Sequence, residues 1–430
     1  MGGGVLQLAA YGGQDIETMG NPQMTFFKSV YKKHTNFSIE IIEQSFNGNI
    51  TKEESRVDST ISKSGDLIHG CHLDIKFPEF PVGSGSSYNN WVNSTGYAYV
   101  KEVSLSIGEL QIDKHYSEWF DIWNELTDIQ IKEHLLVNKH ILKEWHLREN
   151  TGNCKPIQCY VPLIFWFNRY YNCALPILAL QYHDVKLNFT FRNLDFLINT
   201  DGTLGNNTEA PSVKLYTEYI FLDVEERKMF ANNKHEYLIE QVQHKNINFS
   251  KINEIKFNFQ VKELIWVVRN NNAGLEKTSN IDSISNKSNT DSTTSHTFIN
   301  GNDYFNYETN TYDTNRIEYV GGYASNEPFE KCKIVMNGID RFSEQKASYF
   351  RTMQPLRYHS RTPTKHIYMY SFSLNPEKYQ PSGTCNFSRL HTVNLNFDNI
   401  TTDDSQLLVF ATNYNVLVIS SGMAGLKYAN

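Results

Sequence analysis

The sequence predicts an all-β protein made of two tandem sandwiches of one fold, and a long-range repeat is the main reason. The segment Leu180–Phe189 returns as Leu390–Phe397, with His, Val, Leu, Asn and Phe in the same order and the two histidines 208 positions apart. Ile42-Glu43-Gln44 returns 197 positions later as Ile239-Glu240-Gln241. A period of 20 to 50 residues would indicate a solenoid, whereas a period of about 200 indicates two whole domains. The aromatic content of 13% is typical of sheets that bury Tyr, Phe and Trp.

Short alternating segments separated by tight turns predict the strands. Leu67–Phe77 alternates apolar and polar residues, as a half-buried strand does. Gly108-Glu109 and Asn337-Gly338 each join two such segments, and the Asn-Gly pair favours a type I′ hairpin turn. After these turns, Ile112-Asp113-Lys114 matches Ile339-Asp340-Arg341, a looser third instance of the repeat.

Two apolar runs predict strands in the middle of a sheet. Val161–Phe167 and Ile367–Leu374 are apolar on both faces, as strands covered on both sides would be. Such segments fit the sandwich interior. Pattern alone leaves open which kind of sandwich it is, and a jelly roll is one solution.

Two segments interrupt the strands. Tyr116 to Trp145 has helical spacing, which predicts one or two helices inserted in the first domain. Asn270 to Asn315 is rich in Asn, Ser, Thr and Asp, which predicts a long exposed loop without a core role. Phe26 and Phe27 are expected to mark the start of the first core. The predicted division is therefore an N-terminal arm over 1–26, a first domain over 27–224, a linker over 225–235 and a second domain over 236–430.

Composition excludes several classes of protein. The net charge of −7 argues against a nucleic-acid coat, because phosphate binding needs a basic surface. Six cysteines without CxxC spacing and a start without a signal peptide predict reduced thiols in a chain made in the cytosol. No run of about 18 apolar residues is present, so we expect no transmembrane segment. We expect no cofactor and no metal.

A few local patterns could carry chemistry, but each has a simpler structural interpretation. His72-Leu-Asp74 fits half of a two-histidine, one-carboxylate iron site, yet it also fits a solvated strand face. The adjacent carboxylates are expected to point to opposite faces of strands rather than to act as acid and base; they are Glu53-Glu54, Glu225-Glu226 and Asp403-Asp404. His183 and His391 occupy matching places in separate domains, which favours a shared structural hydrogen bond over catalysis.

A set of collinear motifs carries a family resemblance. They are Leu6–Asp15, Gly20–Lys28, Tyr31–Phe37, Ile112–Tyr116, Ala174–Pro176, Ala179–His183, Tyr219–Asp223, His235–Gln241, Pro381–Arg389, Asn413–Leu417 and Ser421–Leu426. Together they resemble the major capsid proteins of large nucleocytoplasmic DNA viruses, of the chlorovirus and iridovirus type. The match runs from residue 6 to the C-terminus and fails mainly in Asn270 to Asn315 and in the helical insertion.

The resemblance implies a double jelly roll of two eight-stranded sandwiches with a helical insertion in the first. It also implies a structural capsid subunit, not an enzyme, with no catalytic, cofactor or metal site. Expected partners are two further copies in a pseudo-hexagonal homotrimer, neighbouring capsomers, and minor capsid proteins beneath the shell, with no direct nucleic-acid binding. The expected location is the virion capsid, after synthesis and assembly in the host cytoplasm.

The N-terminal arm has a predicted role in the capsid, and two other functions are considered beside the capsid one. The N-terminal arm is expected to contact inner-shell partners, and its basic cluster Lys28, Lys32, Lys33 and His34 could meet an acidic one. One alternative is a sugar-binding jelly roll that uses exposed loops such as Tyr88 to Trp91. The other is a cupin-like or iron-dependent oxygenase, which lacks the clustered His-x-His and Glu ligands of a cupin site.

Overall fold

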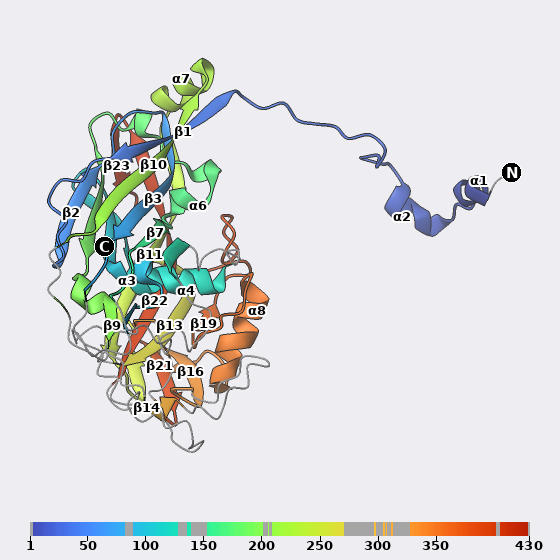
Figure 1. The fold of residues 1–430 in the computed structure, drawn as a ribbon. Coiled ribbons are helices and arrows are strands. Elements are labelled where there is room, and N and C mark those ends of the chain that lie inside the picture. Colours follow the sequence, from blue (N-terminus) through green and yellow to red (C-terminus); the bar gives the residue numbers. More distant parts are fainter. Residues whose placement is uncertain are drawn as a thin grey trace. The chain divides into compact units, whose positions relative to one another are not determined.

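A computed structural model gives the fold of residues 3–81, 89–127, 136–138, 153–200, 205, 209–270, 296–297, 304–305, 307, 311–312, 327–400 and 405–428. The chain divides into two units, residues 1–37 and residues 38–430. The first unit contains the short helices α1 (Gly3–Ala9), η1 (Gly13–Asp15) and α2 (Ile16–Met19) (Figure 1). Its described residues are exposed apart from Asp15, which is half-buried.

The first jelly roll consists of two four-stranded sheets. One sheet has the order β1-β10-β3-β7 and the other has the order β2-β8-β5-β6. The strands are β1 (Phe37–Gln44), β2 (Ser55–Thr60), β3 (Leu67–Phe77), β5 (Val100–Ile107), β6 (Leu110–Tyr116), β7 (Ile157–Pro162), β8 (Val185–Phe191) and β10 (Ser212–Leu222). A short pair, β4 (Asn89–Trp91) and β9 (Ile198–Thr200), lies beside them.

The second jelly roll repeats this arrangement. Its sheets have the orders β11-β22-β13-β19 and β12-β21-β16-β17. The strands are β11 (His235–Asn248), β12 (Ile252–Glu254), β13 (Gln260–Asn270), β16 (Lys331–Met336), β17 (Ile339–Asp340), β19 (Tyr368–Ser371), β21 (Val393–Asp398) and β22 (Ser405–Ser420). The side strands β18 (Gln345–Lys346), β20 (Cys385–Asn386) and β23 (Met423–Leu426) extend them, and β14 (His296–Thr297) pairs with β15 (Thr311–Tyr312).

The two jelly rolls have identical connectivity. When the eight main strands of each are numbered in chain order, both rolls contain one sheet ordered 1-8-3-6 and one ordered 2-7-4-5. The repeated sequence segments lie on equivalent strands, because Leu180–Phe189 leads into and along β8 and Leu390–Phe397 leads into and along β21. The predicted all-β double jelly roll is confirmed. The helix α7 (Val224–Asn232) joins the last strand of the first roll to the first strand of the second.

Both predicted hairpins form, and their turns show why glycine is needed. Asn337 and Gly338 have positive φ of 50° and 81°, as a type I′ turn requires, and they connect Met336 to its partner Ile339. Gly108 has φ of 63° and connects Ile107 to Leu110. The turns therefore place Leu110, not Ile112, at the position of Ile339, so the looser third sequence match is shifted by two residues.

The structure corrects three local predictions. Phe26 and Phe27 are 89% and 98% exposed, so the first core does not begin there; strand β1 begins only at Phe37. Val161–Phe167 is not one strand, because β7 ends at Pro162 and helix α6 (Trp166–Arg169) follows. Its apolar residues are buried by helix packing as well as by the sheet. Both β7 and β19 lie at the edges of their sheets rather than in the middle.

The predicted helical insertion is present in part. Helix α4 (Ser117–Leu126) follows β6 directly, while most of the segment between it and Trp145 lies outside the described residues. The other helices with described bounds are α3 (Thr95–Tyr99), η3 (Tyr171–Cys173), η4 (Ile177–Ala179), η5 (Leu194–Leu197), η8 (Tyr349–Met353), α8 (Gln354–Tyr358) and η9 (Phe387–Arg389). Helix α4 lies between the two jelly rolls (Figure 1).

Candidate functional site: the interface between the two jelly rolls

The sheet β11-β22-β13-β19 is apolar on both faces, and each face has a different partner. Leu264 and Trp266 of β13 point into the core of the second jelly roll. The alternate residues Ile265 and Val267 belong instead to the hydrophobic cluster of the first jelly roll. Phe410 of β22 stands opposite Ile265 and shares this second face. Because side chains alternate along a strand, one sheet serves as the wall of its own sandwich and as the docking surface for the other.

Helix α4 covers this outer face. All ten of its residues are buried, and the helix ends where the Thr127 amide donates to the Trp123 carbonyl. The Trp119 ring lies 5.5 Å from that of Phe410 on the opposite jelly roll and 5.7 Å from that of Trp123. Burying side chains of this size stabilises an interface by roughly 1.5–3 kcal/mol each. The tryptophans of α4 therefore hold the two jelly rolls as one body.

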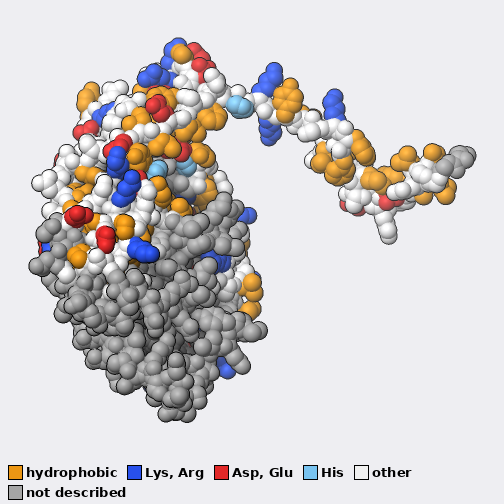
Figure 2. Space-filling model, viewed as in Figure 1, with side chains coloured by type: hydrophobic (Ala, Val, Ile, Leu, Met, Phe, Trp, Pro, Cys, Tyr) orange, Lys and Arg blue, Asp and Glu red, His pale blue; other side chains and the backbone are white. Residues whose placement is uncertain are grey.

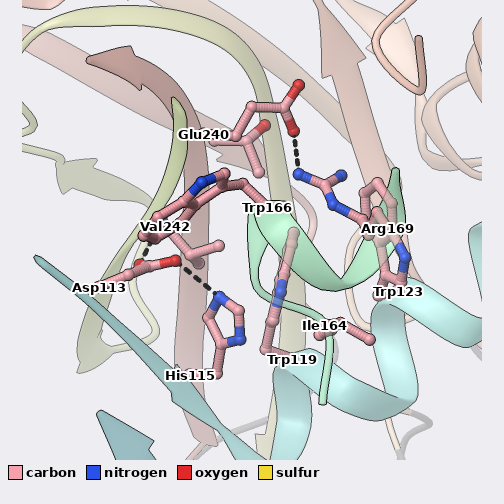
Figure 3. A pocket seen from close by; sticks show the side chains of 10 residues that line it. Asp113, His115, Trp119, Trp123, Ile164, Trp166, Arg169, Glu240 and Val242 are labelled. Atoms are coloured by element: carbon pink, nitrogen blue, oxygen red, sulfur yellow. Dashed lines mark hydrogen bonds and ion pairs between the residues drawn. The ribbon is translucent and has the colours of Figure 1, made fainter. Parts of the chain in front are cut away.

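A buried ion pair crosses the interface next to these tryptophans. Arg169, at the end of α6, bonds to Glu240 of β11, and its guanidinium lies 4.8 Å from the Trp123 ring (Figure 3). Lys262 of β13 approaches Glu240 at 2.7 Å from the other side. Burial opposes ionisation of the Glu240 carboxyl, but the two cations outweigh it and lower its pKa. Removing one partner of such a pair would leave a buried charge, which costs about 3–5 kcal/mol.

A second buried carboxylate links α4 to the end of strand β13 in the same sheet. Glu118 pairs with Arg269 of β13 and lies 3.9 Å from Arg192 of the first jelly roll. Burial would raise the pKa of this carboxyl, but Arg269 and then Arg192 hold it at about 2. The Glu118 carboxyl is therefore ionised at every physiological pH, and its ion pair with Arg269 connects the two jelly rolls at any of these pH values.

The third charged group lies in the second jelly roll beneath Trp123. His359 contacts Glu263 through Nε2 and Glu377 through Nδ1, both at 2.8 Å. Burial opposes the charged imidazole, but Glu263 and then Glu377 raise its pKa to about 9. Correspondingly, His359 lowers the pKa of the fully buried Glu263 to about 2 against the opposing effect of burial. The His359 and Trp123 rings are nearly perpendicular, at 83°, with ring centroids 6.4 Å apart.

A small polar cavity completes the interface. Asp113 of β6 accepts a bond from the Val242 amide at 3.0 Å and pairs with His115 at 2.9 Å. These residues, Arg169 and Glu240 line a cavity of about 10 Å³ together with the tryptophans of α4 (Figure 3). That volume is about the size needed for one water molecule. The cavity is too small for an organic substrate, so we assign the polar residues that line it a structural role.

One part of the predicted exposed loop is buried in this interface. Tyr304, Phe305 and Tyr307 are 3%, 3% and 1% exposed and belong to the cluster that contains α4. The Tyr307 hydroxyl donates to Asp121 at 3.3 Å, and Lys365 of the second roll pairs with the same carboxylate at 2.6 Å. The prediction that 270–315 has no core role is therefore wrong for these three aromatic residues. The rest of that segment lies mostly outside the described residues.

The residues that sequence patterns suggested for chemistry do not converge. His72 stacks on Tyr216 at 5.3 Å, and Asp74 accepts a bond from Gln158 at 2.7 Å, both on the outer face of one sheet. In the described part of the chain, no three His, Cys, Asp or Glu side chains are grouped to hold a metal ion. Glu54 pairs with Lys101 at 2.9 Å.

The other candidates have local structural contacts. Glu53-Glu54 lies in a loop and Glu225-Glu226 on α7, so neither pair is on a strand as expected, and Asp403-Asp404 lies outside the described residues. His183 Nδ1 accepts from the Ala424 amide at 3.2 Å, whereas the His391 amide donates to Asn337 at 2.8 Å. The two histidines thus lie at equivalent places but make different bonds.

The loop proposed for sugar binding has another structure. Trp91 belongs to strand β4, is 5% exposed, and donates from Nε1 to the Lys155 carbonyl at 2.8 Å. Tyr88 lies outside the described residues. Trp91 is therefore a core residue and not an exposed platform for a sugar ring.

Comparison with known proteins identifies the family. A family model described as the major capsid protein N-terminus matches residues 25–223, and one described as the large eukaryotic DNA virus major capsid protein matches residues 226–425. The chain is 38% identical to the major capsid protein of Pyramimonas orientalis virus and 36% identical to that of Paramecium bursaria Chlorella virus 1, over 100% of each chain. The chain belongs to the major capsid proteins of large eukaryotic DNA viruses.

Solved structures agree with this assignment. The PBCV-1 virus capsid, described as a quasi-atomic model, contains a chain with a TM-score of 0.74 and 30% identity, and the match covers 94% of this chain and 100% of that one. The Faustovirus major capsid protein has the same TM-score of 0.74 at 13% identity, which supports the fold. The function of this major capsid protein is a structural one in the viral capsid. The interface between its jelly rolls is consequently the structural centre of a capsid building block.

Sequence reasoning missed the charged residues of this interface. Arg169, Glu118 and His359 have no motif around them, and their burial depends on how the two jelly rolls pack. Glu240 did carry a signal, because it is the central residue of the repeated Ile-Glu-Gln segment. Its counterpart in the first jelly roll is Glu43, which is exposed and pairs with Lys214 at 3.0 Å.

Proposed function

We propose that three copies of this chain associate as a pseudo-hexagonal capsomer that tiles the icosahedral shell with neighbouring capsomers. The single observation that carries the proposal is the identical strand order of the two jelly rolls within one unit. One chain supplies two similar blocks in a fixed relation, and three chains supply six. Six similar blocks around one axis produce a nearly hexagonal outline, which packs on a flat facet without gaps.

Light scattering of the purified protein tests this proposal. The expected mass is three times 49.8 kDa, or about 149 kDa, and it should be unchanged on dilution. Interfaces that persist on dilution bury on the order of 2,000 Å² or more. A monomer that stays monomeric at high concentration would overturn the proposed capsomer.

The N-terminal arm is proposed to face the interior of the shell, where it would contact minor capsid proteins. Its apolar residues support this, because Phe26, Phe27 and Val30 are 89%, 98% and 86% exposed in the single chain. Side chains of this kind are costly to leave in water, which favours a partner. The neighbouring Lys28, Lys32 and Lys33 are surface cations that an acidic partner would complement.

We also propose that the protein has no catalytic activity and is assembled in the host cytoplasm. The contacts of His72 and Asp74 support the first point, since both are used within the sheet. The six cysteines support the second, because all are free thiols and five are buried. Among the described helices, none combines the length and the hydropathy needed to cross a membrane.

A further inference from the structure

The contact between the two jelly rolls joins a helix of the first roll to a sheet face of the second. Each roll also has the element that the other one uses. The first roll contributes α4, the helix between its fifth and sixth strands. The second roll contributes the outer face of the sheet β11-β22-β13-β19. The second roll also has a helical segment between its fifth and sixth strands, η8–α8, and the first roll has the equivalent sheet β1-β10-β3-β7. Figure 1 places α4 between the rolls and α8 on the flank of the second one.

The outer face of β1-β10-β3-β7 is open in the single chain. Ile39 and Ile41 of β1 are 43% and 56% exposed, and they alternate with Ile42, which packs on the core. Tyr160 of β7 is 39% exposed on the same face, because its neighbours Cys159 and Val161 point inward. Hydrophobic and charged side chains lie side by side over the described part of the first roll (Figure 2). Such a mixed face suits a contact made during assembly rather than a permanent core.

The helical segment η8–α8 has one buried face and one open face. Phe350 and Gln354 are 0% and 5% exposed and pack on the second roll. Met353 and Leu356 are 55% and 69% exposed, and Arg357 beside them is also exposed. Residues three and four apart lie on one side of a helix, so these three side chains form a continuous outer face. The segment η8–α8, the counterpart of α4, therefore exposes two apolar side chains and one arginine on its outer face.

Charge complementarity points to the same pairing. In the contact within the chain, the cation Arg169 of the first roll meets Glu240 on β11 of the second. The repeat makes Glu43 the counterpart of Glu240, and its side chain is 49% exposed on β1. Arg169 lies at the end of α6 beside α4, and Glu240 also has Lys262 as a second cation on its own sheet. Glu43 likewise has Lys214 on its own sheet, so Arg357 would supply the second cation. A buried neighbour of opposite sign would favour association and fix its register.

We propose that η8–α8 of one chain packs on the outer face of β1-β10-β3-β7 of a second copy, and so repeats between chains the contact that α4 makes within the chain. This inference rests on the proposed capsomer and names the surfaces that build it. The contact is head-to-tail, because one copy offers the helix and the next offers the sheet. A head-to-tail contact forms a closed ring when its rotation fits, and two rolls per chain make that ring close at three copies.

The first experiment places a charge on either surface. Leu356→Glu alters the helix and Ile41→Glu alters the sheet, and Ile252→Glu is the matched control, since Ile252 is 62% exposed on neither surface. Mass measurement by light scattering should show about 149 kDa for the wild type and the control and about 50 kDa for each of the two variants. Circular dichroism should show that all four proteins are folded, because the three positions are exposed in the single chain.

Mixing the two variants tests the direction of the contact. The Leu356→Glu chain retains a normal sheet face and the Ile41→Glu chain retains a normal helix, so one contact remains possible between them. A head-to-tail contact predicts a 1:1 complex of about 100 kDa, twice 49.8 kDa, that does not grow into a trimer. Failure of the mixture to associate, or trimers in either single variant, would overturn the inference. A wild-type monomer would instead overturn the proposed capsomer, so the two failures are distinguishable.

Discussion

The buried imidazole of His359 should make the stability of this protein depend on pH in a defined way. Its pKa is about 9 against a usual value of 6.5, because Glu263 and Glu377 outweigh the effect of burial. A pKa difference of about 2.5 units corresponds to about 3 kcal/mol of folding free energy, at 1.36 kcal/mol per unit. Breaking a buried ion pair by removing one partner costs a similar amount, about 3–5 kcal/mol. We therefore expect His359→Gln to lower the unfolding free energy by roughly 3 kcal/mol at pH 6.5.

The sign of the pH dependence follows from the direction of the shift. A group whose pKa is raised on folding binds its proton more tightly in the folded state, so protonation stabilises the fold. The contribution of His359 is complete below pH 6.5 and is lost as the pH rises through 9. The pKa of Glu263 is lowered to about 2, so its contribution is complete above pH 4.5 and is lost as the pH falls toward 2. Both contributions are present together between pH 4.5 and 6.5.

Denaturant unfolding at pH 6.5, 8 and 9.5 measures this effect. The free-energy difference between the wild type and His359→Gln should shrink as the pH rises, because the wild-type imidazole then loses its charge. Protein concentration is held constant, since association adds to apparent stability. His391→Gln is the matched control, because His391 is exposed and its backbone amide, not its ring, bonds to Asn337. A difference that stays constant or grows with pH would refute the assigned pairing.

Three further outcomes are expected. Replacing the aromatic residues within 304–307 by Gly and Ser should lower the free energy of unfolding by about 3–5 kcal/mol per ring. Replacing 271–295 by a short linker should instead leave the melting temperature nearly unchanged, because loop length costs only about 0.6 kcal/mol per doubling. Gly338→Ala should cost about 1–2 kcal/mol in denaturant unfolding, because φ is +81° there and no atom lies within 4 Å of the added Cβ; Gly425→Ala, equally open, should cost less. Deleting 1–26 should leave trimers intact by light scattering, because the described residues of this arm are exposed in the single chain apart from Asp15, while electron microscopy should show that particles no longer form.

The architecture was predictable from the sequence because it depends on long-range repetition and alternation. The two histidine-containing segments lie before equivalent strands, and Asn337-Gly338 forms the expected turn. The repeat and the turn can both be read from residue types alone, without knowing how the two jelly rolls pack. The aromatic group at Tyr304 to Tyr307 was missed because the average composition of its segment hid three large side chains. A search for clustered aromatics within polar segments would have found it.

The interface was not predictable because burial of charge is a property of packing. Glu118 and Arg169 are ordinary surface residue types, and nothing next to them in sequence marks them as buried. They are ionised in the interior because each finds its partner on the other jelly roll. The apolar run Val161–Phe167 was misread for a related reason. Its residues are buried on two sides by different elements, so no single period describes them.

The differences between the two jelly rolls are as informative as their likeness. Equivalent sheets have the same strand order, yet the outer face is apolar at Ile265 and Phe410 in the second roll and polar at His72 and Asp74 in the first. A strand that is apolar on both faces needs a partner on both, and the second roll has that partner within the chain. The polar outer face can remain in water while the chain folds. The permanent contact is therefore the apolar one, and a contact between chains, which must stay soluble until assembly, would use the mixed face.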